Sequence, residues 1–146
     1  NAGIPKTLVR YLVRYAAENL FGEDLRQVLL DVVDTPVSPE LLPTDEQGEI
    51  AQKTEDKVGP YELHDFFLWH FVEMREDRKQ ILAAAKKAFK GQYGAKTIAG
   101  WLDVFFRRFF SQAFKRNCAP DGIRVFSFDF SKESWSIPSD MPTGIL

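Results

Sequence analysis

Apolar residues recur at every third or fourth position along most of the chain, which is the spacing of one face of an amphipathic helix. From Lys6 to about Phe21, leucine, valine and alanine alternate in this way with arginine and glutamate. The same spacing predicts helices over residues 6–21, 23–33, 60–73, 78–90 and 96–114. We therefore predict a mainly α-helical fold with five helices and an extended C-terminal tail.

Proline, glycine and aspartate mark the ends of several of these helices. Pro5 suits a first-turn position, and Gly22 is expected to close the first helix. Pro36 and Pro39 should stop the second helix, because proline cannot donate a backbone hydrogen bond. Asp77 can cap the fourth helix by accepting hydrogen bonds from its first free amides.

The apolar faces of the later helices predict where the core lies. The helix over 60–73 has an apolar band too wide for a lone surface helix, so it should be buried on more than one side. The band is formed by Leu63, Phe66, Phe67, Trp69, Phe71 and Val72. In the helix over 96–114, a narrower seam is formed by Ile98, Leu102, Phe105 and Phe109. The helix over 78–90 is expected to turn one face inward, formed by Ile81, Leu82, Ala84, Ala85, Ala88 and Phe89.

Two segments lack helical spacing. Residues 43–59 are polar and acidic with few large apolar groups, which predicts a long mobile loop. Beyond Ile123, two sets of side chains alternate, which is a weak pattern of a single strand. The sets are Val125, Ser127 and Asp129 on one side and Phe126, Phe128 and Phe130 on the other.

The composition narrows the class of protein. The 146 residues suffice for one domain with a substantial core, since 45% are hydrophobic and 13 are phenylalanine. A net charge of −2 gives no basic surface for nucleic acid. No apolar run approaches the roughly 18 residues of a membrane-spanning helix, so we expect a soluble protein that does not enter a membrane. The single cysteine, Cys118, fits a reducing, cytoplasmic setting.

The chain starts with Asn1-Ala2 and not with methionine. We interpret these two residues as the remnant of a cleaved tag. Residues 3–146 are then expected to be one portion of a longer protein.

Three cations stand at predicted helix ends. Lys6 lies where the first helix begins, and there free amides and the helix dipole favour an anion such as phosphate. Lys115 and Arg116 lie at the end of the helix over 96–114, where cations stabilise the dipole for structural reasons alone. On the residues themselves, a solvated lysine and a stabilised helix end are the more ordinary interpretations.

The other reactive side chains indicate no particular reaction. His64 and His70 are six residues apart, so on a helix they face different directions and suit partly buried, hydrogen-bonded roles better than a metal site. Cys118 has no histidine nearby in sequence. The chain contains no glycine-rich phosphate loop, and we predict neither catalytic nor metal-binding residues within it.

Five segments occur in a characteristic order along the chain. They are Ile4-Pro5-Lys6-Thr7, Asp34-Thr35-Pro36-Val37-Ser38-Pro39-Glu40-Leu41, Lys57-Val58-Gly59-Pro60-Tyr61-Glu62-Leu63-His64-Asp65-Phe66, Phe109-Phe110-Ser111-Gln112-Ala113-Phe114-Lys115-Arg116 and Trp135-Ser136-Ile137-Pro138-Ser139-Asp140-Met141. Together they resemble the C-terminal part of the synthetase domain of glutamine-dependent NAD synthetases, most of all the large bacterial type in which a glutaminase domain precedes the synthetase. The resemblance spans nearly all of residues 3–141.

The resemblance implies a carbon–nitrogen ligase. In this family, ATP adenylates the nicotinate carboxylate of deamido-NAD and releases pyrophosphate, with magnesium assisting. Ammonia obtained from glutamine then displaces AMP to give NAD. The family's nucleotide-binding domain is α/β, Rossmann-like and of the ATP pyrophosphatase type, so a larger domain of that kind is implied around this helical part.

The resemblance also implies roles for individual residues. By position, Lys6 matches the family's ATP-contacting lysine, and Ser38 matches a small hydroxyl residue that also contacts ATP. Lys115 matches a lysine that contacts deamido-NAD, whereas Phe114 stands where smaller synthetases commonly carry histidine. The stretch 43–59 matches a loop thought to close over the reacting centre.

Other parts of the family's machinery are not in this sequence. The Ser-Gly-Gly-containing pyrophosphate loop, the magnesium carboxylates and the glutaminase Cys-Glu-Lys set lie upstream in the family. We therefore expect this fragment to be inactive alone and, because its apolar faces are broad, to take part in a homo-oligomer. The alternative is a helical interaction module without chemistry, which would use its Phe-rich faces to bind a partner or itself.

Overall fold

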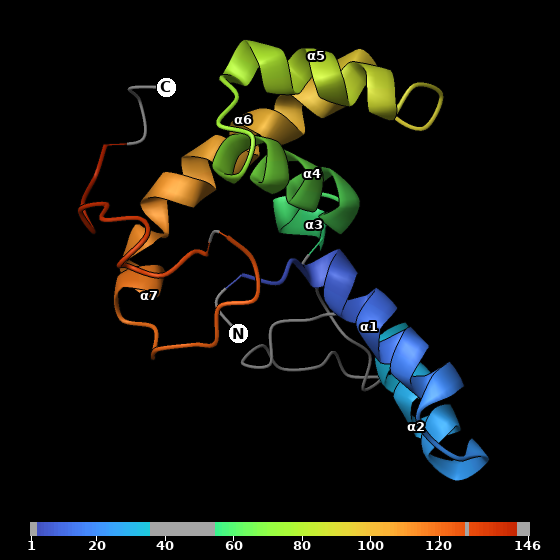
Figure 1. Cartoon of the computed structure of the whole chain (residues 1–146). Coiled ribbons are helices and arrows are strands. Elements are labelled where there is room, and N and C mark those ends of the chain that lie inside the picture. The colour runs from blue at the N-terminus through green and yellow to red at the C-terminus, as the bar shows by residue number, and fades with distance from the viewer. Residues whose placement is uncertain (1–2, 36–54, 128, 143–146) are drawn as a thin grey trace, which may run out of the picture. The chain divides into compact units, whose positions relative to one another are not determined.

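The computed structural model describes residues 3–35, 55–127 and 129–142. The chain divides into two compact units (Figure 1). We call Pro5–Tyr61 the hairpin unit, and Asn1–Ile4 together with Glu62–Leu146 the core unit.

The hairpin unit is built from two helices that lie side by side, α1 (Lys6–Asn19) and α2 (Glu23–Asp34) (Figure 1). The guanidinium of Arg10 donates to the Val33 carbonyl over 3.3 Å, and Arg14 pairs with Asp34 at 2.9 Å. Both helices are present as predicted, but regularly spaced apolar residues of their predicted inner faces are exposed: Val9, Leu12, Leu25, Val28 and Val32. The expected role of Gly22 is wrong, because α1 ends at Asn19 with Leu20 as its C-cap, and Gly22 precedes α2 as its N-cap.

A short helix, α3 (Glu55–Val58), occupies the end of the stretch predicted as a loop over 43–59. Gly59 follows it with a φ of 86°, a left-handed conformation that glycine adopts without strain, and its amide donates to the Glu55 carbonyl over 2.8 Å. The loop prediction is therefore wrong for these last residues. Residues 43–54 lie outside the described part of the chain.

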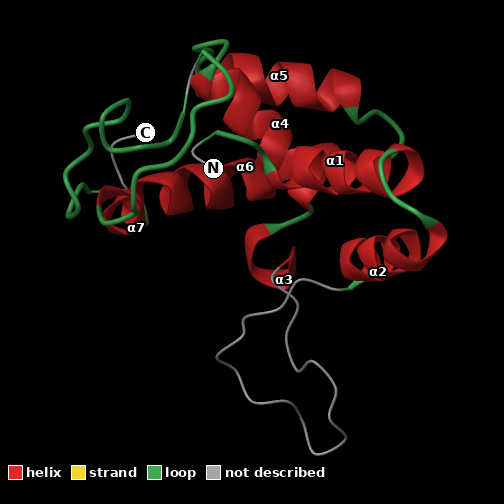
Figure 2. Ribbon diagram, turned by 60° about the horizontal axis from the view of Figure 1, so that its bottom comes forward, coloured by secondary structure: helices red, strands yellow, loops and turns green. Residues whose placement is uncertain are grey.

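The core unit contains α5 (Arg78–Ala88), α6 (Ala95–Ser111), α7 (Ala113–Asn117) and all of α4 (Tyr61–Val72) except its first residue, Tyr61, which belongs to the hairpin unit. Figure 2 shows these helices in red, with the C-terminal segment as a green loop beside α7. Buried side chains from three helices form one cluster: Leu63, Phe67, Val72, Ile81, Ala85, Ile98, Leu102, Phe105, Phe106, Phe109 and Phe110. The described residues contain no strand, and the predicted mainly α-helical fold is confirmed.

The predicted faces agree with this core, with two exceptions. All four residues of the α6 seam are buried, and α4 buries side chains on more than one side. Trp69 of α4, however, is 40% exposed, and Ala88 at the end of α5 faces solvent. Asp77 caps α5 as predicted, because its carboxylate accepts from the Lys79 and Gln80 amides while Gln80 bonds back to the Asp77 amide.

The helix predicted over 96–114 is interrupted. The helix α6 stops at Ser111, and α7 starts after Gln112, whose φ and ψ of −100° and 14° leave the helical region. The guanidinium of Arg116 donates to the Phe109 carbonyl over 2.6 Å, a carbonyl that a continuous helix would bond to the backbone amide four residues on. A side chain beyond the break thus satisfies an acceptor that the break leaves free.

The C-terminal segment forms no strand in its described residues, so the strand prediction for residues 123–130 is wrong there. A strand needs a neighbouring strand to satisfy its backbone, and the neighbours of this segment are helices. Phe126, Phe130 and Trp135 pack against the aromatic core. Phe128 lies outside the described residues. No helix in the described ranges is long and apolar enough to cross a membrane.

Candidate functional site

Lys6 is the first residue of α1, so it stands at the positive end of the helix dipole. The side chain is exposed, and its Nζ lies 5.6 Å from the centroid of the Tyr61 ring, in the same unit. The backbone amide of Tyr61 donates to the Glu55 carboxylate over 3.0 Å, which ties the ring's position to α3. This end of α1 combines a full positive charge with the positive end of the helix dipole, an arrangement that suits a phosphate.

Lys115 lies in α7, and its side chain is exposed. Its Nζ is 5.9 Å from the centroid of the Phe114 ring. Phe114 is 45% exposed, whereas Phe105, Phe106, Phe109 and Phe110 of α6 are at most 7% exposed. The structure therefore places a cation and an accessible aromatic ring next to each other on the surface of α7.

The predicted site residues fall in different parts of the chain. Lys6 belongs to the hairpin unit and Lys115 to the core unit, and each is placed within its own unit only. Ser38 lies outside the described residues. The structure thus gives the local contacts of Lys6 and of Lys115. That Lys6, Ser38 and Lys115 belong to one site remains a prediction.

A hollow of about 660 Å³ lies beside α7. Arg116 lines it, while Lys115 does not. Its other walls are the start of the core unit and two parts of the C-terminal segment: Gly3, Ile4, Ala119, Pro120, Asp121, Gly122, Arg124, Asp129, Phe130, Ser131, Lys132 and Glu133. The three cations among these residues are matched by three carboxylates, so the formal charges cancel and give no selectivity for an anion.

Arg116 turns inward from the helix that carries Lys115. Its guanidinium carbon lies 4.3 Å from the centroid of the Phe109 ring, and burial lowers the pKa of the group. The contact combines a cation–π interaction with the hydrogen bond to the Phe109 carbonyl. Sequence periodicity could not assign this role, because the inward direction depends on the break at Gln112.

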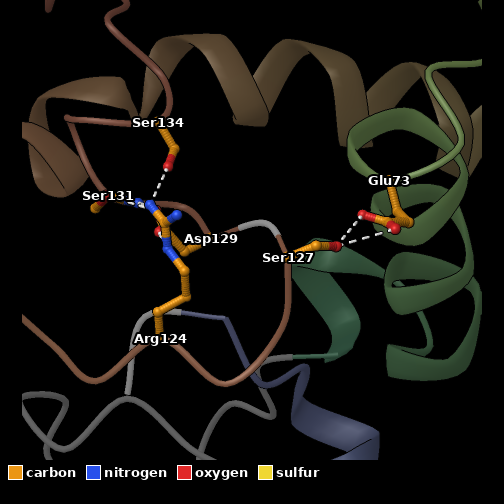
Figure 3. Close-up of polar contacts among 6 residues, drawn as sticks. All are labelled: Glu73, Arg124, Ser127, Asp129, Ser131 and Ser134. Carbon is orange, nitrogen blue, oxygen red and sulfur yellow. Dashed lines mark hydrogen bonds and ion pairs between the residues drawn. The ribbon is translucent and has the colours of Figure 1, made fainter.

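One wall of the hollow contains the buried carboxylate of Asp129. Figure 3 shows its polar contacts with neighbouring residues of the C-terminal segment. Asp129 is 3% exposed and accepts hydrogen bonds from Ser131 and, over 2.5 Å, from Arg124, which also donates to Ser134 over 3.1 Å. The hydroxyl of Ser131, followed by its amide and by Ser134 and Arg124, holds the pKa of Asp129 far below its usual range, against the effect of burial. The sequence pattern does not reveal this cluster, because in it Asp129 is only one residue of an alternating, strand-like stretch.

Both histidines are partly buried, and His70 is hydrogen-bonded as predicted. Nδ1 of His70 lies 2.7 Å from the Glu76 carboxylate, and the Phe66 ring stacks on the imidazole at 4.1 Å. His64 packs edge-on against Phe105 at 5.4 Å. These contacts account for both side chains within the core unit.

Comparison with known proteins shows what this chain is similar to. No protein-family model matches it. The glutamine-dependent NAD(+) synthetases of Mycobacterium tuberculosis and Mycobacterium bovis are each 35% identical to it over 165 aligned residues, and that of Mycobacterium leprae is 34% identical. Each alignment covers 99% of this chain, and the chain spans about a quarter of the relatives' length, 24%. The resemblance read from the sequence is therefore confirmed: over almost its whole length, this chain is similar to a segment of the glutamine-dependent NAD(+) synthetases.

Proposed function

We propose that this chain is the C-terminal part of the synthetase domain of a glutamine-dependent NAD(+) synthetase, a carbon–nitrogen ligase. The observation that carries the proposal is the 35% identity to such enzymes across 99% of the chain. The full-length protein would convert deamido-NAD to NAD with ATP, through an adenylated intermediate, and take ammonia from glutamine. The helical units would then complete a larger α/β nucleotide-binding domain.

In this proposal, the two lysines contact different substrates. Lys6 and Ser38 bind ATP, and the position of Lys6 at the positive end of the α1 dipole supports a phosphate contact. Lys115 binds deamido-NAD, and its exposed ammonium supports pairing with an anionic group of that substrate. Both contacts position charged groups, and the residues that perform the chemistry belong to other parts of the protein.

Magnesium assists the adenylation step when bound, by neutralising phosphate charge. In the described ranges, no three His, Cys, Asp or Glu side chains converge in a way that could hold a metal ion. In the family that the chain resembles, the magnesium carboxylates lie upstream of the matching segment, and we propose the same placement here.

The assignment of Lys115 predicts a substrate-binding defect. In the full-length protein with free ammonia as nitrogen donor, Lys115→Ala should raise the KM for deamido-NAD about tenfold, the size expected for losing one solvent-accessible charged contact. The KM for ATP should stay within about twofold of the parent value. Steady-state measurement of NAD formation at varied deamido-NAD gives both constants.

Lys90→Ala provides a matched control for Lys115→Ala. Lys90 is an exposed lysine of the core unit that lies after α5 and away from α7 in sequence, and its removal should leave the KM for deamido-NAD unchanged. If Lys115→Ala behaves like Lys90→Ala, the assignment of Lys115 to the deamido-NAD site is wrong.

We also propose that the 146-residue chain is inactive on its own. It spans 24% of the length of the relatives, so most of the residues that hold ATP and generate ammonia would be missing. The purified chain should form no NAD from deamido-NAD, ATP and ammonium chloride, with a complete relative as the positive control. Measurable turnover by the chain would contradict this expectation.

The full-length protein is proposed to be a cytoplasmic homo-oligomer. The apolar surface of the hairpin unit supports the homo-oligomer, because Tyr11, Tyr15, Leu20, Val28 and Val32 are each more than half exposed. Exposed apolar surface of this extent favours contact with another protein surface. A monomer in sedimentation equilibrium would count against the oligomer.

A further inference from the structure

The helix that carries Lys115 cannot fix its own orientation. The five residues of α7 are too few for a stable isolated helix, because a helix needs several turns to offset the cost of nucleation. Where Lys115 points therefore depends on what holds α7 to the rest of the core unit. Two neighbouring side chains, Arg116 and Asn117, make those contacts.

Arg116 attaches α7 to α6. Its Nη2 donates to the Phe109 carbonyl over 2.6 Å, and its guanidinium lies over the Phe109 ring. Because Phe109 is only 7% exposed, this contact reaches into the aromatic core. It connects α7 to the helix that comes directly before it in the chain.

Asn117, the residue after Arg116, attaches α7 to the C-terminal segment. Its side-chain nitrogen donates to the Ile137 carbonyl and to the Ser139 hydroxyl, each over 2.9 Å. The bonded segment is itself anchored, because the Trp135 ring lies 5.3 Å from the Phe109 ring and 5.4 Å from the Phe71 ring. A primary amide has two hydrogens to donate, and both have an acceptor here.

Lys115 and Asn117 are two residues apart, so their side chains are separated by about 200° around the helix axis. Asn117 faces the C-terminal segment, and Lys115 stands on the exposed side of α7. Fixing one side of a helix this short fixes the direction of the other. A change at Asn117 would let α7 rotate or shift and displace the Lys115 ammonium.

We propose that Asn117 is a positioning residue for Lys115, and that through it the segment Trp135–Ser139 supports deamido-NAD binding without touching the substrate. This inference rests on the proposed function of Lys115. It assigns to the C-terminal segment a role in substrate affinity that its sequence alone does not suggest. The bonds to Ile137 and Ser139 are the link between the segment and the site.

The test is a double-mutant cycle in the full-length protein, with free ammonia as nitrogen donor. Asn117→Ala should raise the KM for deamido-NAD about fivefold and leave kcat and the KM for ATP within about twofold. If Asn117 acts through Lys115, the double variant Lys115→Ala, Asn117→Ala should have the same KM as Lys115→Ala alone. Independent effects would instead multiply to an increase of about 50-fold.

Asn19→Ala is the matched control. Asn19 also donates its side-chain amide to a carbonyl, that of Tyr15 at 2.8 Å, but within its own helix. Its replacement should leave both KM values unchanged. If Asn117→Ala does not fold, Ser139→Ala carries the test, since it removes one acceptor of Asn117 on an exposed residue. The KM increase in Ser139→Ala should likewise vanish when Lys115 is already alanine.

The outcomes separate the two proposals. If Lys115→Ala leaves the KM for deamido-NAD unchanged, the proposed function of Lys115 fails, and this inference fails with it. If Lys115→Ala raises the KM but Asn117→Ala and Ser139→Ala do not, only the positioning role is overturned. Multiplicative effects in the double variant would likewise overturn it, because they would show that Asn117 acts independently of Lys115.

Discussion

Replacing Phe105 by alanine should lower the free energy of unfolding of the core unit by about 4 kcal/mol, the usual cost of removing a buried phenylalanine. Phe105 is 2% exposed and lies at the centre of the aromatic core. Its ring contacts five others at centroid distances from 5.2 to 6.2 Å: those of His64, Phe67, Phe71, Phe106 and Phe109. The loss includes the transfer free energy of the ring and the cavity left among side chains that cannot close around it.

Urea unfolding followed by tryptophan fluorescence measures this effect, because Trp69, Trp101 and Trp135 all belong to the core unit. Phe114→Ala is the matched control, since it removes the same ring from a residue that is 45% exposed. Its cost should stay below about 1 kcal/mol, because little apolar surface is withdrawn from water at that position. Equal losses in the two variants would contradict the placement of Phe105 in the core.

Replacing Asp129 by asparagine should destabilise the core unit by about 2–3 kcal/mol at neutral pH, since a charged acceptor of several hydrogen bonds becomes a neutral amide that cannot accept them all. The change is nearly isosteric, so the loss reports charge and hydrogen bonding and not packing. Asp121→Asn is the control, because Asp121 is an exposed carboxylate of the same C-terminal segment. Its replacement should change stability by less than about 0.5 kcal/mol.

The effect of Asp129→Asn should depend on pH in a defined direction. The hydrogen bonds of Ser131, first of all, lower the pKa of Asp129 in the folded protein below its value of about 4 in the unfolded chain. The stabilisation is thus fully present above pH about 4, and it is lost as the pH falls from there towards the folded pKa. The difference in urea midpoint between Asp129→Asn and the parent protein should therefore be smaller at pH 3 than at pH 7. A gap that widens at pH 3 would refute this account.

Most helices of this chain are determined by local pattern. Four of the five predicted helices are present as single helices, the fifth is divided into α6 and α7, and Asp77 caps α5 through the amides of Lys79 and Gln80. The seam of α6 from Ile98 to Phe109 is buried as its spacing predicts. These features depend on residues within one or two helical turns, so the sequence contains them directly.

The candidate site could be described only from the sequence and the tertiary structure together. The order of five short segments was enough to indicate the family and to select Lys6, Ser38 and Lys115, and similarity across 99% of the chain agrees with that resemblance. The sequence did not indicate that α7 is separate from α6, or that Arg116 turns inward to Phe109. It also gave no sign that Asn117 contacts residues 20 and 22 positions later.

The sequence by itself thus determined most of the helices, the buried faces of those in the core unit and the family that the chain resembles, because these follow from residue spacing and from the order of short segments. The tertiary structure alone decided the break at Gln112, the burial of Asp129 and the attachment of α7 to the C-terminal segment. Each of these depends on which acceptor or aromatic surface a distant part of the chain brings close. Such partners are set by packing between elements, and a local period of two or 3.6 residues carries no information about them.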